Sequence, residues 1–352
     1  MIRRQVQLFG LLACLSGSTL LAGGPCYQFE PLDMSVRDAF RAGRAMAHIL
    51  AEPGWLVWCN SVIRWTDGKY HAYYARWPVG TQHAGWLTDC EIAHGVADKP
   101  EGPFAYQGTV IANANPGDWG VNAHNPYAVI AEGKICLYYI ANDLRGKPPG
   151  VPRSVIRNSQ VTGVAIADNP AGPFRRSEQP VVVPHGRFKN IAVNPAVNYH
   201  AGKYVMIIKG DDATKEKTHR IQLVGQSDRP EGPFAFLDRP VYAARQTEDA
   251  CLWYDQTTQR FNMVCHVMGA PVLAWLVSED GDNWRAAEQP VFMKKEFVMS
   301  DGTVWKPARV ERPFVLTDEL GRPQMLYVAI LDGHQQANIA LRITQTMEDK
   351  KP

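Results

Sequence analysis

Three stretches of this chain share one pattern: NSVIRWTDGKYHAYY (residues 60–74), NPYAVIAEGKICLYY (125–139) and NPAVNYHAGKYVMII (194–208). Each begins with Asn, runs through an apolar segment to a Gly-Lys pair, and ends in a second apolar segment. Gly in such a pair suits a tight turn, so each stretch predicts two antiparallel strands joined by a turn. Two weaker copies begin at Asp249 and Arg312, so the pattern recurs every 55 to 69 residues.

A second short motif lies between the copies of the first. It reads KPEGPF (99–104), NPAGPF (169–174), RPEGPF (229–234) and, in a degenerate form, EDGDNW (279–284). An alternating segment precedes each copy, an apolar strand follows it, and the Pro and Gly residues favour a turn. Each unit of roughly 60 residues therefore contains four antiparallel strands, which is typical of a propeller blade.

Five such units predict an all-β fold, a five-bladed β-propeller over residues 55–345. A β-sandwich also contains many short strands, but it gives no reason for a turn motif to recur at this period. Residues 25–54 form an N-terminal extension with a short helical segment, for which Ser35 is the expected N-cap. We expect residues 346–352 to form a polar tail.

The N-terminus has the layout of a secretory signal over residues 1–24, with Arg3 and Arg4 before an apolar stretch and small residues after it. The sequence therefore predicts export to the periplasm or the extracellular space. Lipid attachment is an alternative, since Cys14 ends a stretch that resembles a lipid-attachment motif. The motif has an atypical form, and Cys26 suits attachment poorly because it follows a proline.

The bulk composition excludes one large class of proteins. The 352 residues are 45% hydrophobic and 20% charged, with a formal net charge of +2 and no run of like charge, unlike a nucleic-acid binder. The cysteines show no CxxC pair and no disulfide framework, although one pair could be bridged in an oxidising compartment. We expect most of those beyond the signal to be small buried side chains: Cys59, Cys90, Cys136, Cys251 and Cys265.

The first strand of each propeller unit lines the central channel, so the residues that begin the units are expected to converge at one mouth. This expected ring consists of Asn60, Asn125, Asn194, Asp249 and Arg312. Asn side chains donate and accept hydrogen bonds at once, and sugars present hydroxyl groups on all sides. The ring is therefore predicted to bind a carbohydrate.

Sugars also present apolar faces, which pack well on aromatic rings. Trp58, Trp77 and Trp119 lie close to turns and strand ends near the ring, and we expect these three to contact the substrate. Arg76 is expected to face the same cleft. Three cations of a later loop suggest an acidic or sulfated glycan: Arg145, Lys147 and Arg153.

Glycoside hydrolysis usually requires two carboxyl groups, one as acid and one as base or nucleophile. The ring offers Glu248, Asp249 and Glu311, and strand alternation points only one of the adjacent pair into the channel. Nearby cations could hold a carboxylate ionised or bind an anionic substrate: Lys306, Arg309 and Arg312. His124 is a further catalytic candidate, because its neutral pKa range suits proton transfer or metal binding.

The five units resemble the five-bladed propeller glycosidases related to families 43 and 117 over about residues 55–345, in the Asn-Pro starts of the second and third units, the Gly-Lys turns of the first three and the GPF turns. The resemblance implies a secreted bacterial enzyme for plant or algal polysaccharides, with an Asp base at the start of blade one, a second Asp and a Glu acid. This chain has Asn60 at the blade-one position, and an amide cannot take a proton from water. Either the base has moved, with Asp249, Glu248 or His124 as its replacement, or the protein is not a standard hydrolase of this kind.

The sequence thus predicts an exo-acting glycoside hydrolase with carboxylate acid/base catalysis in the propeller channel. A propeller that binds sugar without cleaving it is the alternative, and a glycoside phosphorylase is a third reading. No cofactor is certain, and a divalent metal ion at the channel centre is left open. The expected partner is a carbohydrate; no transmembrane partner is evident, and the oligomeric state is not determined by the sequence.

Overall fold

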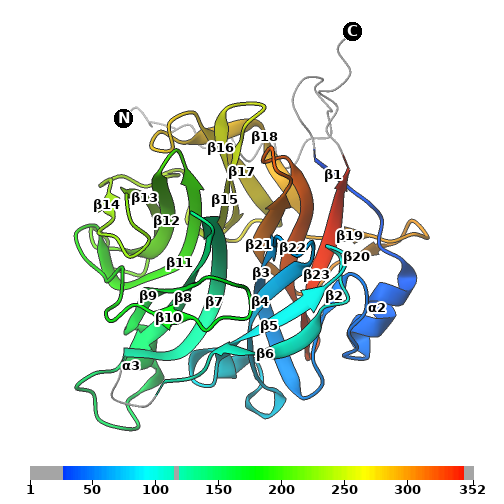
Figure 1. The fold of residues 1–352 in the computed structure, drawn as a ribbon, viewed down its shortest axis with the longest axis horizontal. Helices are drawn as coiled ribbons and strands as arrows, with labels where there is room; N and C mark the ends of the chain where they lie inside the picture. Colours follow the sequence, from blue (N-terminus) through cyan, green and yellow to red (C-terminus); the bar gives the residue numbers. More distant parts are fainter. Residues whose placement is uncertain (1–26, 115–118, 345–352) are drawn as a thin grey trace, which may run out of the picture.

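Five antiparallel β-sheets surround a central axis (Figure 1). The structure is a computed structural model that describes residues 27–114 and 119–344. These residues form the five-bladed β-propeller that the repeats predict. The expected signal (1–24) and the tail (346–352) lie outside the described residues, as do Cys14 and Cys26.

Each of the first four blades is a four-stranded sheet in chain order. Blade one contains β3 (Trp55–Arg64), β4 (Tyr70–Pro78), β5 (Glu91–Ala97) and β6 (Ala105–Ile111). Blade two contains β7 (Trp119–Ala131), β8 (Lys134–Asp143), β9 (Gln160–Ala167) and β10 (Arg175–Arg176). Blade three contains β11 (Phe188–His200), β12 (Lys203–Asp212), β13 (Arg220–Ser227) and β14 (Ala235–Phe236). Blade four contains β15 (Thr247–Asp255), β16 (Arg260–Val267), β17 (Val272–Ser278) and β18 (Arg285–Lys294).

Blade five combines the last strands of the described chain with its first ones. It consists of β21 (Arg309–Thr317), β22 (Pro323–Asp332) and β23 (Gln335–Thr344), together with β1 (Gln28–Phe29) and β2 (Ile49–Leu50). Both N-terminal strands pair with β23. The N-terminal extension therefore completes the edge of blade five, and this pairing closes the propeller.

A short helix, α2 (Met34–Arg41), lies between β1 and β2 and buries Val36 and Phe40. Its N-cap is Asp33, whose carboxylate accepts a hydrogen bond from the Ser35 backbone N–H at 2.9 Å, so the expected cap at Ser35 is wrong. The remaining short elements are η1 (Val79–Thr81), η2 (His83–Leu87), α3 (Arg153–Arg157), β19 (Phe297–Val298) and β20 (Val304–Trp305). Among the described residues, no helix is long and apolar enough to cross a membrane.

The GPF motifs form the turns between the third and fourth strands of blades one to three, and each also holds the preceding blade. A tyrosine of the second strand of one blade donates a hydrogen bond to the first proline carbonyl of the next motif. This bond recurs at three boundaries: Tyr327 to Pro100 (2.6 Å), Tyr73 to Pro170 (3.0 Å) and Tyr138 to Pro230 (2.9 Å). The motif therefore repeats because it both turns the chain and joins neighbouring blades.

The innermost strand of every blade contains an irregularity in strand pairing, next to a residue in the left-handed conformation. The five residues are Cys59 (φ 32°), Asn125 (φ 50°), Asn194 (φ 58°), Asp249 (φ 59°) and Arg312 (φ 56°). Asn and Asp adopt this conformation more readily than most residues, which accounts for the repeated Asn. The blade-one member is Cys59, so the expectation of Asn60 in this role is corrected by one residue.

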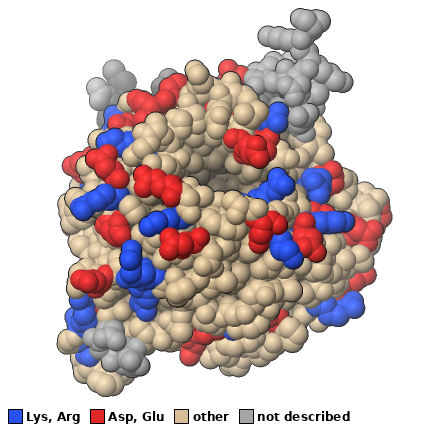
Figure 2. Space-filling model, viewed as in Figure 1, with Lys and Arg blue, Asp and Glu red and all other residues tan. Residues whose placement is uncertain are grey.

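The five cysteines expected to be buried are all buried and unbridged: Cys59, Cys90, Cys136, Cys251 and Cys265. Charged side chains of both signs are scattered over the face in Figure 2, which is hollowed near its centre. The blades thus surround a central channel, and different side chains line its two ends.

Candidate active site

The five left-handed residues meet at the channel centre in a ring of contacts. Cys59 Sγ donates to Asn125 Oδ1 at 2.6 Å, and Asn125 Nδ2 donates to Asn194 Oδ1 at 3.3 Å. Asn194 Nδ2 donates to Asp249 Oδ1 at 2.8 Å, and Arg312 Nη1 lies 2.9 Å from the same oxygen. In the other orientation of the Asn125 amide, which replaces the two bonds given above for Asn125, its oxygen accepts from both terminal nitrogens of Arg312 at 2.7 and 2.9 Å. The structure thus brings together the segments that the repeats predict to converge.

The ring narrows the channel to a cavity of about 30 Å³, which also contacts Asn60, Tyr127 and Phe314. A volume of this size holds about one water molecule. Neither amide atom of Asn60 has a hydrogen-bond partner among the described residues. The ring lies part-way along the long inner strands β7 and β11. It therefore forms the floor of the channel opening on the side where the inner strands begin, and this opening is called the ring mouth below.

Glu248 lies at this mouth and is held ionised by two cations. Its Oε2 accepts a hydrogen bond from Lys209 Nζ at 2.7 Å, and its Oε1 lies 3.4 Å from Arg220 Nη1. Burial alone would raise the pKa of this carboxyl group, but the charges of Lys209 and Arg220 outweigh burial and lower the pKa to about 2. The side chain keeps 11% of its surface exposed, against 1% for Asp249.

The pKa of Glu311 is shifted upward, opposite to that of Glu248. Burial raises its pKa and the negative charge of Asp249 raises it further, although Arg312 and Arg309 oppose both effects. Arg309 Nη1 lies 3.8 Å from the Glu311 carboxylate and is 47% exposed, so solvent weakens this pair. Two carboxyl groups whose environments move their pKa values apart are the usual arrangement of an acid and its ionised partner.

Asp249 is committed to the ring rather than to the mouth. Its side chain is 1% exposed and bonds to Asn194 and Arg312. Its neighbour Glu248 instead contacts Lys209. The two adjacent carboxylates therefore have different partners, and Glu248 is the more exposed of the two.

His124 is buried, with both ring nitrogens engaged. Nδ1 lies 2.6 Å from the Asn122 carbonyl, and Nε2 lies 3.1 Å from the amide nitrogen of Gln160. Nδ1 therefore carries the proton and Nε2 accepts. Burial lowers the pKa of His124 to about 4, so the ring is neutral at pH 7. These contacts suit a residue that positions its neighbours, and a catalytic role for His124 stays a prediction.

One set of side chains has the composition of a metal site. Ligand atoms of Glu248, Asp249 and His266 lie within 4.8 Å of one another, and His266 Nδ1 has no hydrogen-bond partner among the described residues. However, Glu248 already pairs with two cations and Asp249 pairs with Arg312. A divalent ion would lie against three positive side chains, so these residues do not fit a metal ion.

The three tryptophans expected to contact sugar are buried. Trp58, Trp77 and Trp119 are 5%, 1% and 8% exposed. Trp77 donates its indole N–H to the Gln82 carbonyl at 2.8 Å, and Trp119 donates to the Glu178 carbonyl at 2.7 Å. Their rings pack inside the protein, because indole groups of this size fill the space between strands and loops.

Arg76 is likewise held inside blade one instead of facing the cleft. It is 5% exposed and forms ion pairs with Glu52 and Glu91. Its guanidinium lies 4.2 Å from the ring centroids of both Trp55 and Tyr106. These contacts satisfy its charge within the blade, which explains why the expected orientation is wrong.

A partly exposed aromatic side chain does lie near the mouth, on η2. Trp86 is half-buried, and its ring packs edge-on against His124 with centroids 5.7 Å apart. His83 of the same helix contacts Trp58 at 5.6 Å, and its Nδ1 lies 2.9 Å from Gln336 Oε1. Of the tryptophans near the ring, Trp86 is therefore better placed to meet a sugar than the three that were expected.

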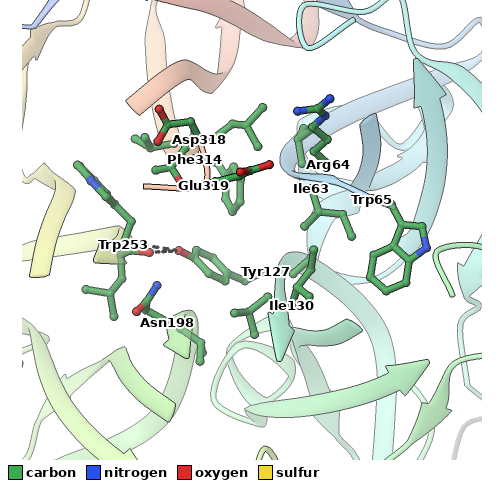
Figure 3. A pocket seen from close by; sticks show the side chains of 18 of the residues that line it. Ile63, Arg64, Trp65, Tyr127, Ile130, Asn198, Trp253, Phe314, Asp318 and Glu319 are labelled. Carbon is green, nitrogen blue, oxygen red and sulfur yellow. Dashed lines mark hydrogen bonds between the residues drawn. The ribbon is translucent and has the colours of Figure 1, made fainter. Parts of the chain in front are cut away.

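A larger cavity of about 750 Å³ lies at the other end of the channel (Figure 3). Apolar and aromatic side chains such as Ile63, Trp65 and Phe314 line it. Its Asp318 is hydrogen-bonded to Arg322 in the same turn at 2.8 Å. The described residues that line this cavity include no two carboxyl groups with opposed pKa shifts, so we place the candidate active site at the ring mouth.

No protein-family model and no curated protein matches the sequence. Solved structures match the fold. A family 117 glycoside hydrolase of the marine bacterium Zobellia galactanivorans is 17% identical over 92% of this chain and 90% of its own, with a TM-score of 0.62. An α-L-arabinofuranosidase from Lactobacillus brevis is 15% identical over 82% and 91%, with a TM-score of 0.56. A family 43 β-xylosidase/α-arabinofuranosidase from a compost metagenome, solved with xylotriose in a calcium-free form, is 15% identical over 91% and 94%, with a TM-score of 0.53.

The chain has the fold of the five-bladed propeller glycosidases of families 43 and 117. The resemblance seen in the repeats is thus confirmed for the fold. Identities this low establish the fold alone, so activity has to be argued from the ring mouth. The resemblance to propeller glycosidases implies an Asp base in blade one. This chain has no carboxylate there: Cys59 occupies the left-handed position and Asn60 follows it.

Sequence reasoning missed Lys209, Arg220 and His266 as parts of this site. Lys209 lies opposite Val193 and His266 opposite Glu248, each beside the residue that precedes a left-handed position. Opposite residues of antiparallel strands share a face, so aligning the second strands of the repeats would have placed both near the ring. Arg220 begins β13, and nothing in the repeat pattern singles it out.

Proposed function

We propose that the protein is a glycoside hydrolase in which Glu311 is the general acid and Glu248 the ionised carboxylate. The observation that carries this proposal is the opposed pKa shift of these two partly accessible groups at one mouth. Asp249 supports the acid, because its negative charge raises the pKa of Glu311. Lys209 supports the carboxylate, because its ammonium group keeps Glu248 ionised.

In the proposed reaction, Glu311 donates its proton to the glycosidic oxygen as the bond from that oxygen to the anomeric carbon breaks. The ionised Glu248 stabilises the positive charge that develops on the sugar ring. A water oxygen then bonds to the anomeric carbon, and the proton that it releases returns to Glu311. Each cycle therefore consumes one water and restores the acid.

We also propose exo action on a plant or algal polysaccharide by an exported protein. The narrow ring closes the floor of the mouth, and a mouth with a closed floor is compatible with a site that takes the end of a chain. The layout of residues 1–24 supports export to the periplasm or beyond. Structural neighbours named as an arabinofuranosidase and a xylosidase support the class of substrate.

A screen of plant and algal oligosaccharides with product analysis tests this proposal. Release of a monosaccharide from a chain end without added phosphate supports it. If none is cleaved while some raise the melting temperature, the protein is a carbohydrate-binding propeller, a reading favoured by the missing carboxylate at Cys59 and Asn60. Cleavage that requires inorganic phosphate identifies a phosphorylase instead.

The activity is expected to fall as the pH rises through the pKa of Glu311, because the acid must be protonated. The Arg309 charge lowers this pKa, so Arg309→Met is expected to raise it and to move the alkaline limb of kcat/KM to higher pH. The acidic limb should stay in place, because Glu248 remains ionised down to a pKa of about 2. A pH profile of both proteins measures the shift, and a shift to lower pH would contradict the assignment.

Cys59→Ser is expected to leave kcat and KM essentially unchanged. Burial raises the pKa of the Cys59 thiol to about 12, so no thiolate is present at neutral pH to act as a nucleophile. Steady-state kinetics and treatment with iodoacetamide test this, with Cys90→Ser as the control for a second buried thiol. Loss of activity in Cys59→Ser alone, together with inactivation of the wild type by the reagent, would assign the reaction to the thiol.

A further inference from the structure

Cations outnumber carboxylates around the ring mouth. The three carboxylates are Glu248, Asp249 and Glu311. The five cations are Lys209, Arg220, Lys295, Arg309 and Arg312. Four of the cations lie within 4.0 Å of one of these carboxylates, and Lys295 is the exception among the described residues.

The Lys295 ammonium group is available to a ligand. The residue follows β18, and its backbone N–H bonds to the Pro271 carbonyl at 2.9 Å. The side chain is half-buried, and burial lowers its pKa while the charges of Glu311 and Asp249 oppose that effect. A half-buried cation that has no partner within ion-pair distance in the described part of the chain has a desolvation cost that a bound anion would offset.

The loop cations that the sequence pointed to are less available. Arg145 forms hydrogen bonds to Asp143 and to Gln179. Arg153 donates to the Ala84 carbonyl at 3.0 Å. Arg145 is therefore compensated within the loop by Asp143, whereas Lys295 lies beside the proposed catalytic carboxylates without an ion pair among the described residues.

We propose that the sugar bound at the ring mouth is anionic, with a carboxylate or a sulfate group that Lys295 binds. This inference rests on the proposed hydrolase function and specifies its substrate class. A neutral pentose or hexose can accept hydrogen bonds from these cations but cannot offset their charge. The surplus increases when Glu311 carries its proton, because two ionised carboxylates then face five cations. A negative charge on the substrate reduces this excess of positive charge in the state that reacts.

Matched pairs of substrates test the inference and identify the anion. Uronic-acid oligosaccharides are compared with their carboxyl-reduced forms, and sulfated oligosaccharides with their desulfated forms. We expect one charged member to be cleaved with a kcat/KM at least about tenfold higher than its neutral partner, which corresponds to one charge-assisted contact. Whichever pair shows the difference identifies the group as carboxylate or sulfate.

Lys295→Met tests the assigned contact, and Lys294→Met is the matched control on the exposed neighbouring residue. Lys295→Met is expected to raise KM for the charged substrate about tenfold with little change in kcat, and to leave cleavage of the neutral partner unchanged. Lys294→Met should match the wild type on both substrates.

The outcomes separate this inference from the proposed function. Efficient cleavage of the neutral partners, unaffected by Lys295→Met, would overturn the anionic substrate while leaving the hydrolase intact. No cleavage of any substrate, charged or neutral, would overturn the hydrolase itself. Equal effects of Lys294→Met and Lys295→Met would remove the role assigned to Lys295.

Discussion

Glu311→Gln is expected to lower kcat by roughly 10²- to 10⁴-fold, the usual contribution of general acid catalysis. Gln has nearly the same shape but has no proton to give to the leaving oxygen. The effect should appear in kcat more than in KM, because proton donation matters only in the transition state. Steady-state kinetics on a cleaved oligosaccharide, with a melting curve to confirm folding, measures it.

A substrate with an activated leaving group sharpens this test. The nitrophenolate group of a nitrophenyl glycoside can leave without being protonated. Glu311→Gln should therefore lose much less activity on this substrate than on a natural glycoside. Glu319→Gln on the exposed turn after β21 is the matched control and should behave as the wild type. Equal losses on both substrates would show that Glu311 has another role, and wild-type rates on the natural glycoside would remove it from the site.

The fold could be predicted from the sequence because every blade repeats the same local signals. The alternating strands recur in all five blades, and the Gly-Lys and GPF turns recur in three blades each, so an error in one copy is corrected by the others. The predicted ring residue of blade one, Asn60, was displaced by one residue from the observed Cys59, and the cause is local. In blade one the turn spans Trp65 to Lys69, whereas in blade two only Glu132 and Gly133 separate the paired strands. Counting back from the Gly-Lys pair therefore selects Asn60 instead of Cys59.

The chemistry at the mouth was harder to predict because it depends on contacts between different blades. Glu248 of blade four is ionised by Lys209 and Arg220 of blade three, which lie far from it in the sequence. The expected tryptophans failed for a related reason. Proximity of Trp77 to a turn says nothing about which face its ring covers, and the structure places it in the interior.

Arg312→Met is expected to lower the free energy of unfolding by about 3–5 kcal/mol, the typical cost of removing one partner of a buried ion pair. Asp249 is 1% exposed, and its carboxylate would lose the guanidinium that lies 2.9 Å away. In the amide orientation that faces Arg312, Asn125 would lose the same partner. Chemical denaturation followed by tryptophan fluorescence measures the change. Arg322→Met, which breaks an exposed pair with Asp318, is the control and should cost about 0–1 kcal/mol.

The double variant Asp249→Asn with Arg312→Met decides whether charge or packing is responsible. Neutral Asn at position 249 can keep the bond to Asn194 without a buried charge, so it should recover a large part of the lost stability. If the double variant is as unstable as Arg312→Met, the loss comes from missing arginine packing rather than from an unpaired carboxylate. If Arg312→Met costs no more than Arg322→Met, the ring is not held by this ion pair. Recovery in the double variant would show that the charge of Arg312 compensates the buried Asp249 carboxylate. Arg312 would then supply the positive charge next to Glu248, Asp249 and His266, the residues that do not fit a metal ion.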